Sequence, residues 1–525
     1  MAAVVLGTFA IALPAIGARA SYGARVTADE PQYLTTAISI GEDFDLDISD
    51  ELAERRFEPY HEIDLNPQTI DLDDSGRRVS PHDPLLPALL AVPMRLGGWV
   101  AAKVALAAFA GATAAATLWL AARRLGVPIG SGSLIVGAFF VSPPLTAYAT
   151  QVYPEMPAAL CLVLGLAAAT GPLGHRGRAV LLLSVIALPW LSIKYAPLAA
   201  VLVVALAART WRHGGRRLAS DLAILVAAAA VYLAFHRSVY GGWTAYASGD
   251  HFADGELLVL GQDPDYLGRS RRLVGLLVDK GFGLVAWTPA YLLAVPALAA
   301  LARRRPPGWA ALVAVFSAGY AVATWVAPTM HGWWWPGRQL VVVLPVVVVA
   351  VAMLAAGRPS EAPRPERPVS AANKSGQQAG AARERSEPER ASPRFYAGVC
   401  ASVRARSRHV AVLGPALVGC GVGIFNWLWL VAEASTGRRT LVTDFEATAN
   451  PVYRAWRMLL PDHRDFDTNS VALTVVWASV LAATGIWAVL SERPEPDGHR
   501  TPDQPQRPTG TDATPTAPPD LDAGK

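Results

Sequence analysis

Apolar stretches of about 20 residues recur along the chain, separated by polar segments of very different lengths. A stretch of this length is what an α-helix needs to cross the hydrocarbon core of a bilayer. The pattern therefore predicts an all-α polytopic membrane protein with about 12 transmembrane helices. Residues 179–209 fit either two short spans broken between Pro189 and Lys194 or one long span. The expected spans are 1–20, 97–122, 131–149, 155–172, 179–193, 194–209, 218–236, 283–301, 308–327, 338–356, 409–431 and 471–490.

Basic residues set the expected orientation, because short loops rich in Lys and Arg stay in the cytoplasm. With these spans, every basic cluster falls on one side of the membrane, together with both termini. The first 20 residues lack a basic start and many spans follow, so we expect a first span or signal anchor rather than a cleaved signal. The basic clusters are residues 123–124, 175–178, 209–217, 303–305 and 358–408.

The opposite, extracytoplasmic face then receives the segments 21–96, 237–282, 328–337 and 432–470. The first is strongly acidic, with fifteen Asp or Glu and only two Arg between Asp29 and Asp74. It ends in SPHDPLLPALLAVP, which predicts a turn that enters a helix lying along the membrane surface.

Two polar segments complete the organisation. Residues 357–408 and 491–525 are rich in Pro and charged or small polar residues, which predicts a disordered cytoplasmic loop and tail. The expected units are therefore a transmembrane core, 1–356, and a C-terminal transmembrane pair, 409–490, whose outer loop is 432–470.

Composition agrees with a membrane protein and excludes several other classes. The chain is 52% hydrophobic, and its 17% of charged residues lies well below the roughly one quarter of soluble domains. The small net charge of +4 does not indicate nucleic-acid binding. The three cysteines are scattered, so they indicate neither a metal site nor a disulfide framework. No Walker A loop or GxGxxG unit is present.

Residues 43–47, DFDLD, raise the question of a bound metal. The run lacks the Gly and the distal Glu of a calcium-binding EF-hand loop. Its apolar and acidic residues alternate, which predicts a half-buried strand. A divalent metal is therefore not indicated.

The stretch ADEPQYL, which follows the first span, is the strongest candidate for chemistry. Asp29 can cap the helix that follows, Glu30 suits the positive end of that helix, and Pro31 fits its first turn. Alternatively, Asp29 is a general base at the outer membrane surface, where it takes a proton from an incoming hydroxyl. Both interpretations can hold together.

The order of these motifs resembles the GT-C superfamily of membrane glycosyltransferases, in particular the family-39-like branch. That branch includes protein O-mannosyltransferases and the aminoarabinose transferases of lipid A. The resemblance covers roughly residues 20–350, and this chain has HDPLLP where the family often has PPL or PGLP. The further segments that carry it are 41–61, 79–93, QVYPEMPAAL at 151–160, 188–199, 277–293 and WWWPGRQLVVVLP at 333–345.

The resemblance implies transfer of a sugar from a polyprenyl-phosphate donor, with inversion, on the extracytoplasmic face of a plasma membrane. The Ala-, Arg- and Pro-rich composition is consistent with a bacterium of high genomic G+C. In this superfamily an acidic pair in the first outer loop contains the catalytic carboxylate, so Asp29 is the expected base. Glu30 either positions the acceptor or only favours the helix start. The acceptor is a glycan, a lipid or a protein.

A departing phosphate requires cations, and the outer ends of the spans offer several. Lys194 and Arg338 are the leading candidates, and Lys280 is a further one, although basic residues at the lipid boundary often only snorkel. Arg269, Arg271, Arg272, His251 and His331 are weaker candidates on the same face. Other candidates for substrate contact are Tyr33, His82, Asp83 and Glu155.

Two other functions are open from the sequence. A transporter or lipid-linked-sugar flippase predicts ionisable residues at the bilayer midplane and two related halves. The polar residues gather instead at outer span ends, and no halves repeat. A non-catalytic membrane scaffold, in which Asp29 is only a cap, is the third interpretation.

Overall fold

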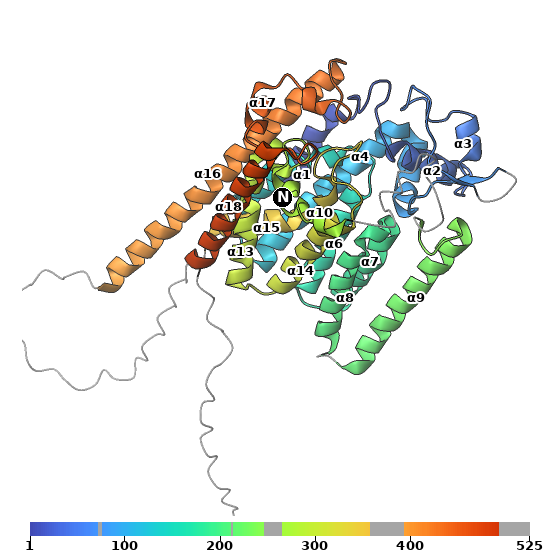
Figure 1. Ribbon diagram of the computed structural model, residues 1–525. Helices are drawn as coiled ribbons and strands as arrows, with labels where there is room; N and C mark the ends of the chain where they lie inside the picture. Colours follow the sequence, from blue (N-terminus) through green and yellow to red (C-terminus); the bar gives the residue numbers. More distant parts are fainter. Residues whose placement is uncertain (72–75, 212–213, 246–264, 358–392, 493–525) are drawn as a thin grey trace, which may run out of the picture.

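The computed structural model describes residues 1–71, 76–211, 214–245, 265–357 and 393–492, and for 393–409 it describes the backbone alone. Helices make up most of these residues (Figure 1). Within them the only sheet is a short antiparallel pair, β1 (Ile70–Asp71) with β2 (Arg78–Val79). The predicted all-helical class is therefore confirmed.

The helices of the first half belong to α-helical and short 3-10 types. They are α1 (Ala2–Ala12), η1 (Leu13–Ala15), α2 (Glu30–Glu42), α3 (Ser49–Ala53), α4 (Leu85–Arg124), α5 (Ile129–Phe140), η2 (Ala147–Ala149), α6 (Glu155–Ala169), α7 (His175–Leu191), η3 (Ile193–Tyr195), α8 (Ala196–Thr210) and α9 (Gly215–Tyr240).

The second half adds one π-helical turn, η8. Its helices are α10 (Tyr266–Arg269), α11 (Arg272–Val278), α12 (Leu284–Trp287), η7 (Pro289–Leu293), α13 (Ala294–Arg304), α14 (Trp309–Ala321), η8 (Val322–Val326), η9 (Arg338–Leu340), α15 (Leu344–Ala356), α16 (Pro393–Ser435), η10 (Phe445–Ala447), α17 (Pro451–Arg457) and α18 (Thr468–Ser491).

Among the described residues, six helical stretches are long and apolar enough to cross a membrane. Shorter apolar helices cover four more of the expected spans, at Ala2–Ala15, Ile129–Phe140, Glu155–Ala169 and Leu344–Ala356. These lengths and compositions are those of a membrane protein. The six long stretches are Leu85–Arg124, Ile193–Thr210, Gly215–Tyr240, Trp309–Val326, Val410–Ser435 and Thr468–Ser491.

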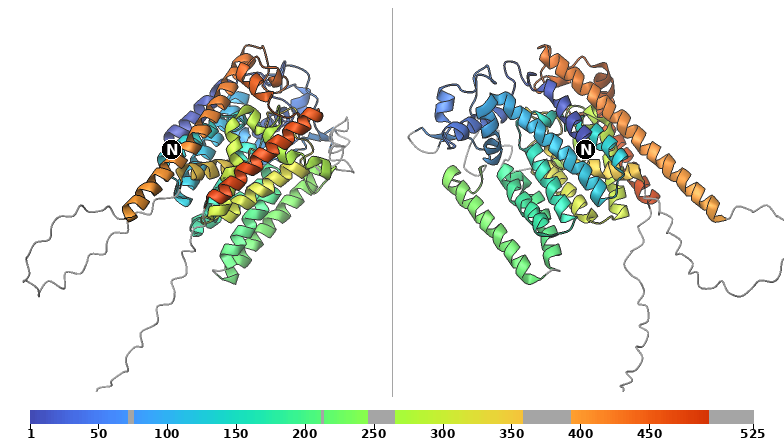
Figure 2. Two further views of the ribbon diagram at one scale, coloured as in Figure 1. Left: turned by 60° about the vertical axis from the view of Figure 1, so that its left-hand side comes forward. Right: turned by 180° about the vertical axis from the view of Figure 1, so that it is seen from behind.

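Helix α15 forms the centre of the bundle. Every residue from Leu344 to Ala355 is buried, and the helix packs against α4, α5, α13 and α16 (Figure 1). Its run of valines suits this place, because a helix that is apolar all round must be covered on every side. In contrast, α9 and α16 stand at opposite edges of the bundle (Figure 2). Helix α9 exposes apolar side chains such as Val226 and Val231, as expected for a surface that faces lipid.

The helix predicted after the HDP turn is present as the first part of α4, which begins at Leu85. A kink at Gly97 and Gly98 separates it from the long apolar part that follows. Gly98 has φ +62°, which a residue with a side chain rarely adopts. The first part packs along α2, so the two helices support each other within the acidic segment 21–96.

Two predictions from the sequence require correction. Residues 43–47 do not form a strand: Phe44 is 81% exposed, and its φ of +63° is left-handed. The Asp45 side chain accepts hydrogen bonds from Ser39 and from the backbone of Asp47, and such local bonds compete with a strand. Helix α16 begins at Pro393, well inside the segment expected to be disordered, because Ala and Arg favour helix there.

Three predictions fall outside the described residues. These are the position of His251, the disorder of 358–392 and the disorder of the tail after residue 492.

The packing of α16 gives a prediction about stability. A Cβ added to Gly419 or Gly423 would lie 2.4 Å from an atom of Ala290 or Thr288, whereas one added to Gly421 would meet nothing within 4 Å. We expect Gly419→Ala and Gly423→Ala each to destabilise the protein by about 1–3 kcal/mol, since small residues allow this close approach. Thermal unfolding of the full chain in detergent measures this.

Gly421→Ala is the matched control for these variants. Because Ala favours a helix over Gly, it should unfold at the same temperature as the parent or slightly higher. Equal losses of stability in all three variants would show that helix α16 does not approach η7 in this way.

Candidate functional site

Asp29 precedes α2, but its side chain does not cap the helix. The carboxylate turns away and accepts a hydrogen bond of 2.8 Å from Nη2 of Arg338. Glu30 instead holds the turn before the helix, since its Oε1 accepts from the backbone N–H of Thr27 at 3.2 Å. The prediction that Asp29 caps α2 is therefore wrong, because Arg338 competes successfully for its carboxylate.

Arg338 joins two acidic residues that are far apart in sequence. Its Nε donates to Oε1 of Glu155 at 3.0 Å, while Nη2 holds Asp29. Oε1 of Glu155 also accepts from Nζ of Lys194 at 2.7 Å. The result is one chain of alternating charge, Asp29–Arg338–Glu155–Lys194, which we call the charge relay cluster.

Four segments meet at the charge relay cluster. Asp29 lies before α2, Glu155 begins α6, Lys194 lies in η3 and Arg338 begins η9. Gly337 precedes Arg338 with φ +83°, and a Cβ there would lie 2.7 Å from Leu284. The tight turn at Gly337 therefore allows Arg338 to point into the protein.

Aromatic rings fix the Arg338 guanidinium. Its Cζ atom lies 3.8 Å from the ring centroid of Tyr153 and 5.1 Å from that of Trp334. The Tyr153 ring is fully buried, so this stacking restricts the guanidinium to one plane. Sequence reasoning did not select Tyr153, although it stands two residues before Glu155 in QVYPEMP.

Two further predicted residues lie beside Asp29. Nε2 of His82 is 3.8 Å from Oδ2 of Asp29, and its Nδ1 lies 3.0 Å from the hydroxyl of Ser80. The Tyr33 ring packs edge-on against His82, with ring centroids 4.6 Å apart. Both side chains are buried, so they form one wall of the space around Asp29.

The pKa values of the adjacent residues Asp29 and Glu30 are shifted in opposite directions. Burial by itself raises the pKa of Asp29, but the Arg338 guanidinium and His82 outweigh burial and hold the pKa well below its usual value. For Glu30, burial raises the pKa above its usual value, although Lys103 and two backbone N–H groups oppose this. The Asp29 side chain is 21% exposed, whereas Glu30 is 1% exposed. Of the two, Asp29 is therefore the more accessible acid and the one whose pKa is held low.

Glu30 has a structural role. Its Oε2 accepts from the backbone N–H of Val152 at 2.7 Å, which ties α2 to the segment that carries Tyr153. The buried ammonium of Lys103 lies near enough to act on Glu30, and it donates to the backbone oxygen of Arg25 at 2.7 Å. Lys103 was missed, although a lone lysine inside the apolar run 97–122 is a signal of function or pairing.

Asp83 does not join the charge relay cluster, but it binds the backbone next to Lys194. Its Oδ2 accepts from the backbone N–H of Ile193 at 3.1 Å, directly before Lys194. Its Oδ1 accepts from Tyr232 at 2.9 Å and lies 3.0 Å from Nε2 of His236, both on α9. Asp83 thus fixes the segment that presents Lys194.

The remaining predicted cations lie elsewhere. Lys280 pairs with Asp462 at 2.5 Å, next to a buried group in which Asp279 lies between His331 and His463. Arg272 donates to the backbone oxygens of Ala327 and Pro328 at 2.6 and 2.8 Å, beyond the end of η8. These residues join other connecting segments to one another rather than to the charge relay cluster.

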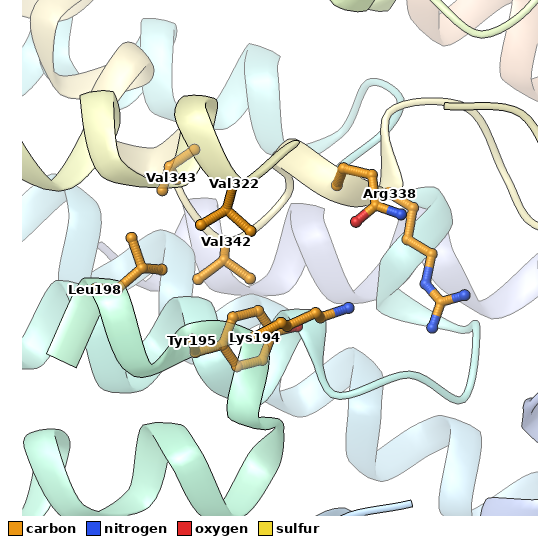
Figure 3. A pocket seen from close by; sticks show the side chains of 9 residues that line it. Lys194, Tyr195, Leu198, Val322, Arg338, Val342 and Val343 are labelled. Carbon is orange, nitrogen blue, oxygen red and sulfur yellow. The ribbon is translucent and has the colours of Figure 1, made fainter. Parts of the chain in front are cut away.

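A pocket opens between Lys194 and Arg338 (Figure 3). Both cations extend toward the same space, and apolar side chains of α8, η8 and residues 342–343, just before α15, line the region behind them (Figure 3). The pocket therefore has a cationic edge and an apolar lining. The lining residues are Lys194, Tyr195, Leu198, Gly319, Val322, Arg338, Gln339, Val342 and Val343.

Loss of Arg338 should destabilise the protein strongly. In Arg338→Gln, Asp29 loses its cation and Glu155 keeps only Lys194, and unpairing a buried ion pair costs about 3–5 kcal/mol. Thermal unfolding in detergent should therefore begin at a much lower temperature. The control is Arg464→Gln, since Arg464 forms an exposed ion pair with Glu446 that is worth at most about 1 kcal/mol. Similar losses in both variants would contradict the bridging role.

Comparison of the chain with protein-family models, with curated proteins and with solved structures finds no match. The resemblance to membrane glycosyltransferases therefore rests on the sequence motifs, and the charge relay cluster has to be interpreted from its own geometry.

Proposed function

We propose that this protein is a GT-C-like membrane glycosyltransferase that uses a polyprenyl-phosphate sugar as its donor. The observation that carries the proposal is the position of Asp29. It is an ionised, accessible carboxylate, bound to a cation that also borders an apolar pocket. A lipid-linked phosphate sugar needs these three features together: a base, a cationic phosphate site and an apolar groove.

The pocket suggests how the donor binds. The phosphate lies between the Lys194 ammonium and the Arg338 guanidinium, and the first isoprenoid units lie along Leu198, Val322 and Val342. An arginine can hold two phosphate oxygens at once, and Tyr153 already fixes its plane. The sugar then projects toward Asp29, on the side expected to face away from the cytoplasm.

Asp29 acts as the base in this mechanism. It takes the proton of the acceptor hydroxyl, whose oxygen attacks the anomeric carbon as the bond to the phosphate breaks, with inversion. The leaving polyprenyl phosphate keeps its electron pair beside Lys194 and Arg338, which stabilise the charge that develops. Among the described residues, Arg338 and His82 both approach Oδ2 of Asp29, so Oδ1 is the oxygen that receives the proton.

Donor binding also activates this base. A carboxylate with a strongly lowered pKa is a weak base, and Arg338 is a main cause of the lowering. When the donor phosphate shares the Arg338 guanidinium, the pKa of Asp29 rises toward the range in which a carboxylate accepts a proton. The acceptor is thereby deprotonated only when the donor is in place.

The first test of this function is Asp29→Asn. The amide oxygen can still accept from Arg338, but it takes no proton, so sugar transfer should fall by about 10²–10⁴-fold. Membranes carrying each form receive a panel of radiolabelled polyprenyl-phosphate sugars at matched expression, and labelled product is counted. The donor that gives product with the parent identifies the sugar.

Glu62→Gln is the matched control. Glu62 belongs to the same acidic segment, but it is exposed and pairs with Arg19 and Arg25, so transfer should be unchanged. Equal product from Asp29→Asn and the parent would exclude Asp29 as the base.

The second test concerns the apolar pocket. In Val322→Trp the larger ring fills part of the pocket. Val326→Trp is the control, because it adds the same ring to the same helix η8 at a site that is 58% exposed and does not line the pocket. Displacing about two methylene groups of the lipid costs about 1.6 kcal/mol, so KM for a long-chain donor should rise about tenfold in Val322→Trp alone. A donor with a truncated lipid should be less affected. An equal effect of both substitutions on both donors would place the lipid elsewhere.

A further inference from the structure

The end of α2 and the short helix α3 bring three acidic side chains together, away from the first turn of α2 that carries Glu30. Asp43 follows the last residue of α2, and Asp50 and Glu51 lie in the first turn of α3. One carboxylate oxygen from each of the three lies within 4.8 Å of the others. Three like charges at such distances repel one another strongly unless a cation lies among them.

Glu51 provides the second and independent observation. The residue is 2% exposed, and neither of its carboxylate oxygens has a hydrogen-bond partner among the described residues. A buried carboxylate without a donor costs several kcal/mol, which natural proteins offset with a cation, with a set of hydrogen bonds or by protonation. Its oxygen is one of the three that converge, so the orphaned group points into the cluster.

The charge of Arg56 acts on Glu51, but among the described residues no basic side chain donates a hydrogen bond to it. The Arg56 guanidinium donates to both oxygens of Glu42, at 2.8 and 2.9 Å, and approaches Glu54 at 3.8 Å. Arg77 and Arg78, from the strand region, pair with Asp47 and Asp71 instead.

The neighbouring aspartates have a different task. Oδ1 of Asp47 accepts from the backbone N–H groups of Ser49 and Arg78, and Oδ1 of Asp45 accepts from Ser39. These bonds hold the loop between α2 and α3 in shape. Asp43, Asp50 and Glu51 therefore converge on a loop that is already fixed.

We propose that Asp43, Asp50 and Glu51 bind a calcium ion that ties α2 to α3. All three ligands are oxygens, which suits a hard cation, and Ca²⁺ accepts 6–8 oxygen ligands at irregular angles. Asp43 and Asp50 are exposed, so water can complete the coordination. The site holds the far end of α2, whose first turn carries Glu30 directly after Asp29, and it is independent of the reaction proposed for Asp29.

The test uses the full chain purified in detergent and freed of metal with EDTA. Tb³⁺, a calcium substitute, should bind and luminesce through nearby aromatic rings, and Ca²⁺ should displace it with a midpoint of about 10⁻⁴–10⁻³ M, as in other extracellular sites. At 100 times that concentration, Ca²⁺ should raise the thermal midpoint by about 2–3 °C.

Glu51→Gln and Asp43→Asn should each weaken Ca²⁺ binding at least tenfold and reduce the thermal shift to about half or less. Asp43 is exposed, so its variant keeps the core intact even where Glu51→Gln folds poorly. The control is Glu54→Gln, which changes an exposed carboxylate that approaches Arg56 just after α3 and should leave both readouts unchanged. Absence of Tb³⁺ emission and of a calcium shift in the parent would overturn the site, as would equal binding by Asp43→Asn and the parent.

Discussion

The guanidinium of Arg338 is buried, and a buried charge is tolerated only when ionised partners and hydrogen bonds surround it. Asp29 and Glu155 supply the charges, and Tyr153 supplies a flat surface for the guanidinium plane. Four segments that are distant in sequence must meet for this arrangement to exist. The tight turn at Gly337, directly before η9, allows Arg338 to reach both acids.

The adjacent acids Asp29 and Glu30 have different roles, because Arg338 binds only the first of them. Glu30 is enclosed by backbone N–H groups and the ammonium of Lys103, so it fastens α2 to the segment before α6. Asp29 keeps an accessible side next to a pocket with a cationic rim and an apolar lining. These different roles suit the transferase proposed above. Glu30 holds the start of α2 in place, and Asp29 beside it remains accessible as the base.

The acidic segment 21–96 repeats this separation of roles farther along the chain. The carboxylates of Asp45 and Asp47 accept hydrogen bonds from hydroxyl and backbone donors, and these bonds hold the loop in shape. Asp43, Asp50 and Glu51 converge, and among the described residues no donor binds the buried oxygens of Glu51. Similar residues in one short stretch thus divide into structural acids and acids that are available to a cation. The proposed calcium ion would stiffen the helix that begins at the charge relay cluster.

The sequence by itself determined the helical membrane class, because the length of an apolar run and its lack of charge depend on local composition alone. It also selected Asp29, Glu155, Lys194 and Arg338, since each is a charged residue at the end of an apolar run. Only the tertiary structure decided that these four lie in one cluster, because pairing across more than 300 residues leaves no local pattern. For the same reason the sequence left open a capping role for Asp29 that the structure does not show, and predicted a strand at 43–47 where side-chain hydrogen bonds form a turn. It also gave no indication that Asp43 would meet Glu51, since their approach depends on how α3 folds back on the end of α2.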